Sequence, residues 1–217
     1  MKRIKKEYYF IAILLIMFIS LTFFVVGGKL DMIDELVFNN VIKLENSAIT
    51  KTLYVITSMA STIGILILTI LTAIIFIRKK RFSDFKYVIA NVSVGVILMQ
   101  VLKHIIKRIR PSWKWIKQGG FSYPSGHTIS AMLLYGTLIL LISKRYHGKY
   151  KKQLIALATI MIILTGLSRI YFGAHYLTDV IASIILGTII LIISSMIMNK
   201  EYGSNDKNKD RKTIQIK

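Results

Sequence analysis

The sequence contains no cysteine and only two prolines among its 217 residues. The absence of cysteine excludes disulfide bonds and any Cys-ligated metal site, and it leaves the redox compartment open. The 13 glycines and two prolines mark no linker between domains. We therefore expect one compact domain.

Acidic residues are also scarce, because ten Asp and Glu stand against 30 Lys and Arg and give a formal net charge of +20. Such a charge can indicate nucleic-acid binding. Most of these basic residues, however, lie in short loops beside apolar runs, as at 78–81 and 144–152. Basic residues in such loops set membrane topology and meet anionic lipid. We therefore expect the lipid bilayer, and no nucleic acid, as a partner; the oligomeric state is not indicated.

Apolar residues dominate the chain, which is 54% hydrophobic. Several apolar runs have about 20 residues, the length that spans a bilayer as a helix. They lie at 8–26, 53–77, 87–106, 128–143, 153–171 and 176–198. The first run is too long and bulky for a signal peptide, and no small-residue cleavage site follows it. We predict an all-α integral membrane domain over 1–198, a bundle of six transmembrane helices, and a polar, disordered cytoplasmic tail over 199–217.

The basic loops also predict an orientation for this bundle. The N-terminus and the loops after the second and fourth spans are strongly basic, which places both termini in the cytoplasm. The loop after the third span is basic as well and would lie outside, against this rule. Its basic residues are Lys107, Arg108, Arg110, Lys114 and Lys117. Phosphate binding at the extracytoplasmic face would explain their position.

The segment 27–51 between the first two spans is comparatively acidic, with Asp31, Asp34, Glu35 and Glu45. Its apolar residues recur with helical spacing, which is typical of an amphipathic helix. We predict that it lies along the outer membrane surface. An acidic loop that gates substrate access is the functional alternative.

Three ionisable residues around the junction of the fifth and sixth spans form the first candidate site. His175 and Asp179 are four residues apart, so on a helix they share one face. A carboxylate in this position can orient the imidazole and leave its other nitrogen free to attack. Arg169 adds a permanent positive charge. Together they suggest nucleophilic attack on an anion, most plausibly a phosphate.

A second cluster lies at the end of the third span. Lys103 and Arg110 are seven residues apart, which is two turns of a helix that we predict to stop at Pro111. On such a helix both side chains can converge on one anion. Alternatively, each snorkels to the membrane interface, as basic residues at span ends usually do.

A third cluster, Ser125-Gly126-His127, opens the fourth span. Ser125 can cap this helix, and the N–H groups at a helix start form an anion site, with His127 beside it. The same residues are also an ordinary turn and cap. In the loop before them, aromatic residues are either interfacial anchors or the entrance for a lipid tail. These are Trp113, Trp115, Phe121 and Tyr123.

Taken together, the clusters resemble the signature of the type 2 phosphatidic acid phosphatase superfamily of membrane lipid phosphatases. The three motifs, in the family's order, are Lys103 through Arg110-Pro111, then Pro124-Ser125-Gly126-His127, then Ser168-Arg169 with His175 and Asp179. Each motif alone is weak to moderate, whereas all three at these spacings are specific. The motifs cover residues 103–179.

The resemblance implies a metal-independent phosphatase without cofactors. In it His175 is the nucleophile that forms a phosphohistidine, Asp179 its orienting partner and His127 the general acid. The phosphate would be held by Lys103, Arg110, Ser125, Gly126 and Arg169. Substrates in this family include phosphatidylglycerophosphate, phosphatidic acid and undecaprenyl diphosphate. Gly126 stands where some undecaprenyl-diphosphate enzymes have Asp, which favours the phosphatidylglycerophosphatase B-like branch. The short basic loops and the small size of the chain indicate a bacterial plasma membrane.

Two other classes of protein are compatible with six spans. A lipid or phosphate transporter or flippase would use the intramembrane charges as a pathway. The charges cluster at one face, however, and none marks a path deep in the other spans. A non-catalytic scaffold would tolerate the loss of either histidine, which the complete motifs argue against.

Overall fold

The computed structural model describes residues 2–112, 116 and 118–215, and every regular element within these residues is a helix. In chain order the elements are α1 (Lys2–Val26), α2 (Asp31–Val41), the short 3-10 helix η1 (Ile42–Leu44), α3 (Ser47–Met59), α4 (Thr62–Arg78), α5 (Phe82–Ile106), α6 (Gly126–Arg145), α7 (Lys151–Tyr171) and α8 (Leu177–Gln215). The predicted all-α class is therefore confirmed.

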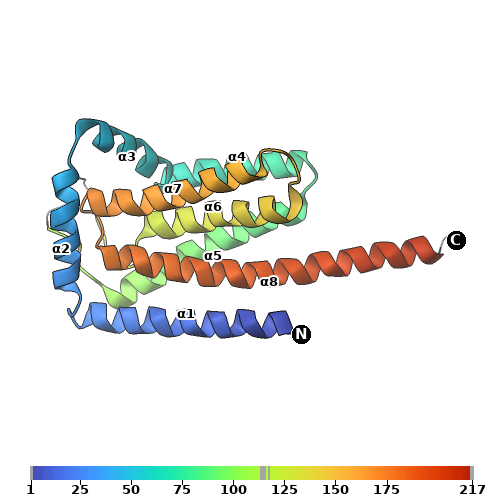
Figure 1. The fold of residues 1–217 in the computed structure, drawn as a ribbon, viewed down its shortest axis with the longest axis horizontal. Helices are drawn as coiled ribbons and strands as arrows, with labels where there is room; N and C mark the ends of the chain where they lie inside the picture. The colour runs from blue at the N-terminus through green and yellow to red at the C-terminus, as the bar shows by residue number, and fades with distance from the viewer. Residues whose placement is uncertain (1, 113–115, 117, 216–217) are drawn as a thin grey trace.

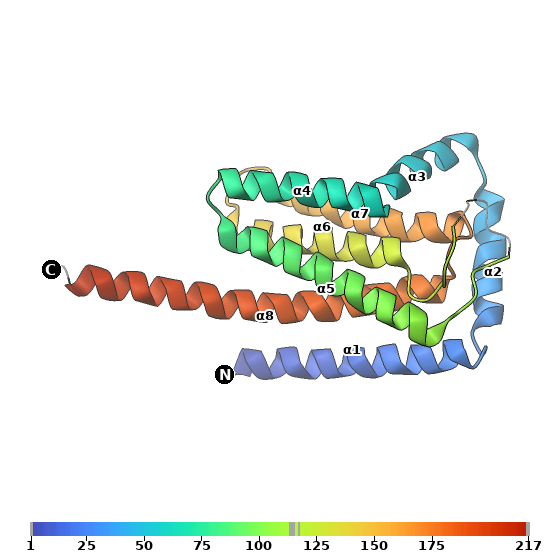
Figure 2. The same cartoon turned by 180° about the vertical axis from the view of Figure 1, so that it is seen from behind.

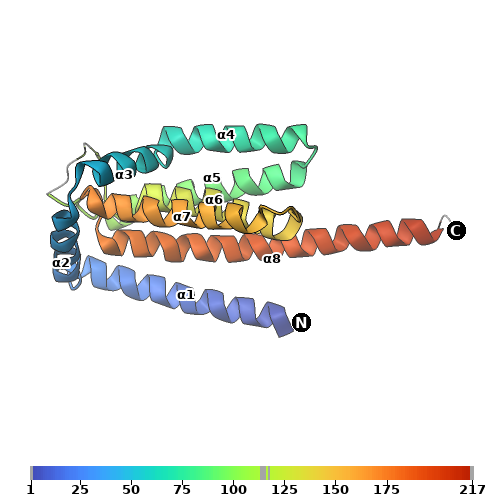
Figure 3. The same ribbon diagram turned by 45° about the horizontal axis from the view of Figure 1, so that its top comes forward.

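The long helices run side by side, and α2 crosses their ends (Figure 1). Helix α6 lies in the middle of the bundle, between α5, α7 and α8. Helix α1 lies at one edge, next to α8 (Figure 3). Both chain ends and the α4–α5 and α6–α7 turns lie at the end of the bundle opposite to α2 (Figure 2). The loops that carry the sequence motifs therefore share the α2 end.

Within the described residues, five helices are long and apolar enough to cross a membrane: α1, α5, α6, α7 and α8. The second predicted span differs from the expectation of one straight helix. It consists of α3 and α4, which meet at an angle of 58° and together give a sixth candidate span.

The bend between α3 and α4 has a local cause. The hydroxyl of Ser61 accepts the N–H of Gly64 at 3.1 Å and so caps α4 as a new helix. At Gly64 a Cβ would lie 2.4 Å from the carbonyl oxygen of Ser58, so the close approach at the bend requires glycine. No proline is involved.

Beyond Met198 the structure continues α8 to Gln215, and this part of the helix projects beyond the bundle (Figures 1 and 2). The disordered tail over 199–217 stays a prediction. No proline follows Met198, so no residue of this segment excludes helical backbone.

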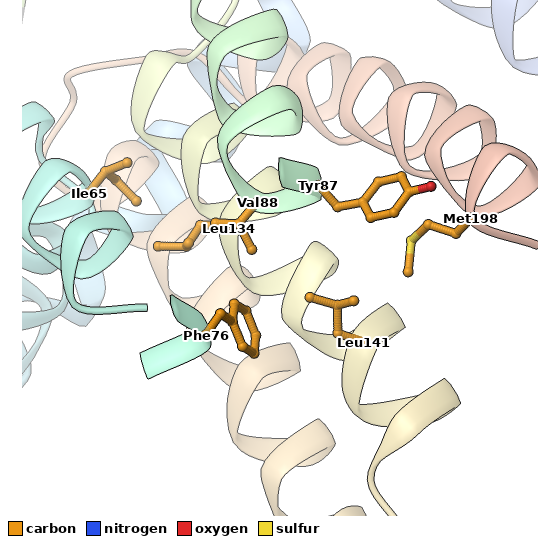
Figure 4. Packing of buried hydrophobic residues seen from close by; sticks show 7 residues of the cluster. All are labelled: Ile65, Phe76, Tyr87, Val88, Leu134, Leu141 and Met198. Carbon is orange, nitrogen blue, oxygen red and sulfur yellow. The ribbon is translucent and has the colours of Figure 1, made fainter. Parts of the chain in front are cut away.

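Apolar side chains of α4, α5, α6 and α8 form one cluster (Figure 4). Its buried members are Ile65, Phe76, Tyr87, Val88, Leu134, Leu141 and Met198. This cluster ties α4 to the central helix. Because Ile65 lies in the first turn of α4, the cluster packs the start of this helix, next to the bend, against its neighbours.

A buried polar contact also joins three of the long helices. The amide of Asn91 on α5 donates to the hydroxyl of Thr137 on α6 at 2.8 Å and to that of Ser194 on α8 at 3.0 Å. Within a bilayer an unpaired amide has no water to bind, so such contacts hold helices together.

We expect Asn91→Ala to lower the stability of the protein in detergent by about 0.6–2 kcal/mol, because both interhelical hydrogen bonds are lost. Thermal unfolding of the purified protein measures this loss. Asn39 on α2 is exposed, and Asn39→Ala is the matched control. Equal melting temperatures for the two variants would contradict a stabilising role for Asn91.

Candidate active site

His175 and Asp179 meet at the junction between α7 and α8. The chain turns through Gly173 at a φ of +59°, a conformation that favours glycine. His175 is only 2% exposed, and its Nδ1 lies 3.3 Å from Oδ2 of Asp179. Sequence spacing predicted both residues on one helical face. In the structure α8 begins at Leu177, so His175 precedes the helix and Asp179 lies in its first turn.

The contact forms because Asp179 reaches back over the helix start. Its Oδ2 accepts the backbone N–H of Tyr176 at 3.0 Å, as an acidic residue in the first turn often does. The same oxygen accepts a hydrogen bond from the hydroxyl of Ser122, which is fully buried. Asp179 is thus fixed from two segments, the 107–125 loop and the start of α8.

Arg110 contacts the other nitrogen of the imidazole. Its Nη1 lies 3.0 Å from Nε2 of His175 and donates to the carbonyl of Ala174 at 2.7 Å. A guanidinium only donates hydrogen bonds, so Nε2 must be the acceptor and the proton resides on Nδ1, facing Asp179. This tautomer leaves the Nε2 lone pair available for attack.

The electrostatic setting of His175 favours the neutral ring. Burial lowers the pKa of His175 to about 3; Asp179 opposes this shift, and Arg110 and Arg169 add to it. The imidazole is therefore uncharged at neutral pH, as a nucleophile requires.

Lys103 and Arg110 come together differently from the sequence prediction. Helix α5 ends at Ile106, where Lys107 adopts a left-handed conformation with a φ of +51°. The chain therefore leaves the helix four residues earlier than expected, and Arg110 projects from a loop rather than from the face that carries Lys103. Pro111 disfavours helical backbone at Arg110, which agrees with this loop.

The ammonium of Lys103 donates to the loop carbonyls of Phe121 and Ser122. Arg110 binds the same loop, since its Nε donates to the carbonyls of Gly119 and Gly120 at 3.0 Å. Both cations thus hold the 118–122 segment against the site.

At the start of α6, Ser125 is fully buried and caps the helix. Its hydroxyl lies 2.9 Å from that of Thr128 and accepts the Thr128 N–H at 3.4 Å. Its carbonyl accepts the hydroxyl of Ser183 on α8. The side chain of Ser125 therefore fixes helix geometry, while Gly126 and His127 line the cavity described below.

Arg169 on α7 is 1% exposed. Its Nη1 donates to the hydroxyl of Thr57 at 2.7 Å and its Nη2 to the side-chain oxygen of Gln118. Its buried Nε has no hydrogen-bond partner within the described part of the chain. Gln118, which the sequence did not single out, thus lies between Arg169 and the cavity.

A cavity of about 570 Å³ lies between α4, α5, α6 and the 118–121 segment. Its polar end is formed by Lys103, Arg110, Gln118, Gly126 and His127. Its other walls are largely apolar and include Leu66, Ile89 and Val96, which are 58%, 37% and 38% exposed on the outer surface of the bundle. The cavity therefore connects the charged residues with the surface that faces lipid.

Of the loop aromatics, Phe121 lines this cavity. Tyr123 is instead fully buried, with its hydroxyl 2.6 Å from that of Thr22 on α1, and is therefore not an interfacial anchor. Trp113, Trp115, Lys114 and Lys117 lie outside the described residues. Among those that are described, no group of three or more His, Asp or Glu side chains is arranged to hold a metal ion.

The family model of the PAP2 superfamily matches residues 84–202, more than half of the chain. The chain belongs to the PAP2 superfamily. The match contains all three clusters that meet around His175, so the resemblance seen in the sequence motifs is confirmed.

Individual PAP2 relatives agree with this assignment. The chain is 33% identical over 100 residues to phosphatidylglycerophosphatase B of Bacillus subtilis, an alignment that covers 45% of this chain and only about half, 49%, of that relative. It is 28% identical over 203 residues to an undecaprenyl-diphosphatase of Sulfolobus acidocaldarius, covering 89% and 92% of the two chains.

Solved structures share the fold. The crystal structure of a transmembrane PAP2-type phosphatidylglycerolphosphate phosphatase from B. subtilis matches with a TM-score of 0.81 at 24% identity, over 88% of this chain and 97% of that one. The crystal structure of LpxE from Aquifex aeolicus matches with a TM-score of 0.60 at 22% identity, over 73% and 92%.

Proposed function

We propose that the protein is a membrane lipid phosphatase that hydrolyses a lipid phosphomonoester or diphosphate through a phosphohistidine on His175. One observation carries the proposal: Nδ1 of His175 faces Asp179 while Nε2 accepts from Arg110, a residue that lines the cavity reaching the lipid-facing surface. The imidazole is thus oriented as a nucleophile beside a cation that can bind phosphate.

In the first step the substrate phosphate replaces Nε2 of His175 as the hydrogen-bond acceptor of Arg110. Nε2 attacks phosphorus, the bond between phosphorus and the lipid oxygen breaks, and His127 donates a proton to that oxygen. The lipid leaves as an alcohol, or as a monophosphate if the substrate is a diphosphate. Asp179 stabilises the charge that develops on the ring.

In the second step His127 removes a proton from water. The water oxygen attacks phosphorus, the bond to Nε2 breaks, and inorganic phosphate leaves. Both histidines return to their starting states.

Charge on the transferred phosphoryl group needs compensation in both steps. Lys103, Arg110 and Arg169 supply three cations, and the first N–H groups of α6 supply donors without an intrahelical acceptor. With this set the reaction needs no bound metal.

The apolar walls of the cavity suit the acyl or isoprenoid chain of a lipid that stays in the bilayer. The names of the relatives support phosphatidylglycerophosphate and undecaprenyl diphosphate as candidate substrates, with phosphatidic acid as a third. The basic turns at the end remote from the site support cytoplasmic termini and a site at the extracytoplasmic face of a bacterial plasma membrane.

The test is phosphate release by the purified protein in detergent from these three lipids. We expect release from at least one of them, with a rate that changes by less than about twofold in excess chelator, because side chains and backbone supply the charge compensation. A stringent requirement for added Mg²⁺ would contradict the proposed phosphate site. If none of the three lipids is hydrolysed, lipid movement across vesicles becomes the next measurement.

A further inference from the structure

The surface helix α2 reaches into the candidate site through Asp34. This residue is 2% exposed, and its carboxylate accepts the backbone N–H of Thr178 at 3.0 Å and the hydroxyl of Thr178 at 2.7 Å. Thr178 lies in the first turn of α8, whose preceding residue is Tyr176, a side chain that is unsuited to capping. Asp34 therefore caps α8 from another helix.

Arg108 connects this cap to the catalytic pair. Its Nη2 lies 2.8 Å from Oδ2 of Asp34, and its Nη1 lies 2.8 Å from Oδ1 of Asp179 and 2.7 Å from the hydroxyl of Thr178. The guanidinium also lies over the ring of Tyr176, 3.9 Å from its centre. These contacts fix its plane from several sides, and the Arg108 side chain is only 10% exposed.

The two oxygens of Asp179 are thereby divided between different partners. Oδ1 accepts from Arg108, and Oδ2 faces Ser122, the N–H of Tyr176 and Nδ1 of His175. Without Arg108, Oδ1 would be a buried carboxylate oxygen without its charged donor. Ser122 and the N–H of Tyr176 would still hold Oδ2, but the carboxylate could turn about that oxygen and weaken its contact with the imidazole.

We propose that Arg108, held by Asp34 of α2, is a positioning residue that fixes the carboxylate of Asp179 against His175. The inference rests on the proposed function, because it assigns His175 and Asp179 their roles. Neither Arg108 nor Asp34 belongs to the three motifs. Arg108 acts on the reaction only through Asp179, in the way that residues behind metal-ligating histidines orient their ligands.

The same geometry gives α2 a role. Helix α2 supports Asp179 and is therefore a fixed component of the site. Its acidic residues are explained without the alternative of a loop that gates substrate access. Asp31, whose carboxylate is 66% exposed and 3.3 Å from Arg108, contributes little to this support.

The test uses the full chain in detergent with a short-chain phosphatidic acid. We expect Arg108→Gln to lower kcat by about 10–100-fold with KM changed by less than about threefold, because phosphate binding is left intact. Arg108→Lys should recover part of the loss, since it restores the charge without the planar fork. Asp34→Asn combined with Arg108→Gln should be more active than Arg108→Gln alone, because the double variant no longer buries two carboxylates without their shared cation.

Two exposed residues on or beside α2 serve as matched controls. Lys43 and Glu35 are exposed, and Lys43→Gln and Glu35→Gln should retain wild-type kcat. The amount of folded protein is measured for each variant by size exclusion. A wild-type kcat for folded Arg108→Gln, or a loss that merely follows the folded fraction, would overturn the positioning role.

His175→Ala in the same assay distinguishes a failure of the positioning role from a failure of the proposed function. If it is inactive while Arg108→Gln is unaffected, only the positioning role fails. If it is fully active, the proposed function fails, and the role of Arg108 fails with it.

Discussion

His175→Asn should reduce phosphate release by on the order of 10³-fold or more, because it removes the only atom that we assign to the bond with phosphorus. Asparagine retains a donor that can face Asp179, so the buried carboxylate keeps a partner and the fold should survive. The measurement is kcat in detergent, together with rapid acid-free quenching to detect a phosphorylated protein. The wild type should show transient phosphorylation and the variant none.

His147→Asn is the control, since His147 lies on an exposed loop at the opposite end of the bundle. It should be as active as the wild type. Undiminished turnover in well-folded His175→Asn would exclude this residue as the nucleophile, and phosphorylation of that variant would place the covalent bond elsewhere.

His127→Asn should slow turnover of a lipid phosphate by about 10²–10⁴-fold, because a lipid alkoxide is a poor leaving group without a proton donor. The loss should depend on the leaving group. An aryl phosphate departs without protonation, so its first step should be nearly unaffected by the substitution. The second step needs His127 as base with either substrate.

The variant should therefore release a burst of aryl alcohol and then accumulate phosphorylated enzyme. The burst amplitude and the fraction of labelled protein are the quantities to measure. An equal loss with both substrates and no burst would mean that His127 binds phosphate rather than moving a proton.

Much of the fold followed from local patterns in the sequence. Runs of about 20 apolar residues are sufficient to predict spanning helices, and the basic turns predict which ends lie together. The α3–α4 bend could not be predicted, because it depends on the contact of Gly64 with the carbonyl of Ser58. The end of α5 was expected at Pro111, because no glycine or proline lies between Ile106 and Pro111, whereas the helix ends at Ile106 through a left-handed Lys107 that the sequence does not mark.

For the candidate site, motif spacing alone identified the two histidines, Asp179 and the three cations as site residues. The residues that orient them were not found. The sequence analysis grouped Arg108 with the basic loop residues whose position phosphate binding would explain, and Asp34 with the acids of an amphipathic segment. Their pairing spans 74 residues of sequence and becomes visible only when α2 and the 107–125 loop are packed together.

The dependence of α8 on Asp34 also bears on how the protein is made. Thr178 and Asp179 lie near the C-terminal end of the chain, whereas their partners Asp34 and Arg108 are synthesised much earlier. Before the last span is inserted, Arg108 and Asp34 can already pair with each other, because their side chains lie 2.8 Å apart. Insertion of the last span adds Asp179 and Thr178 to this pair, so the site is completed by the segment that is synthesised last.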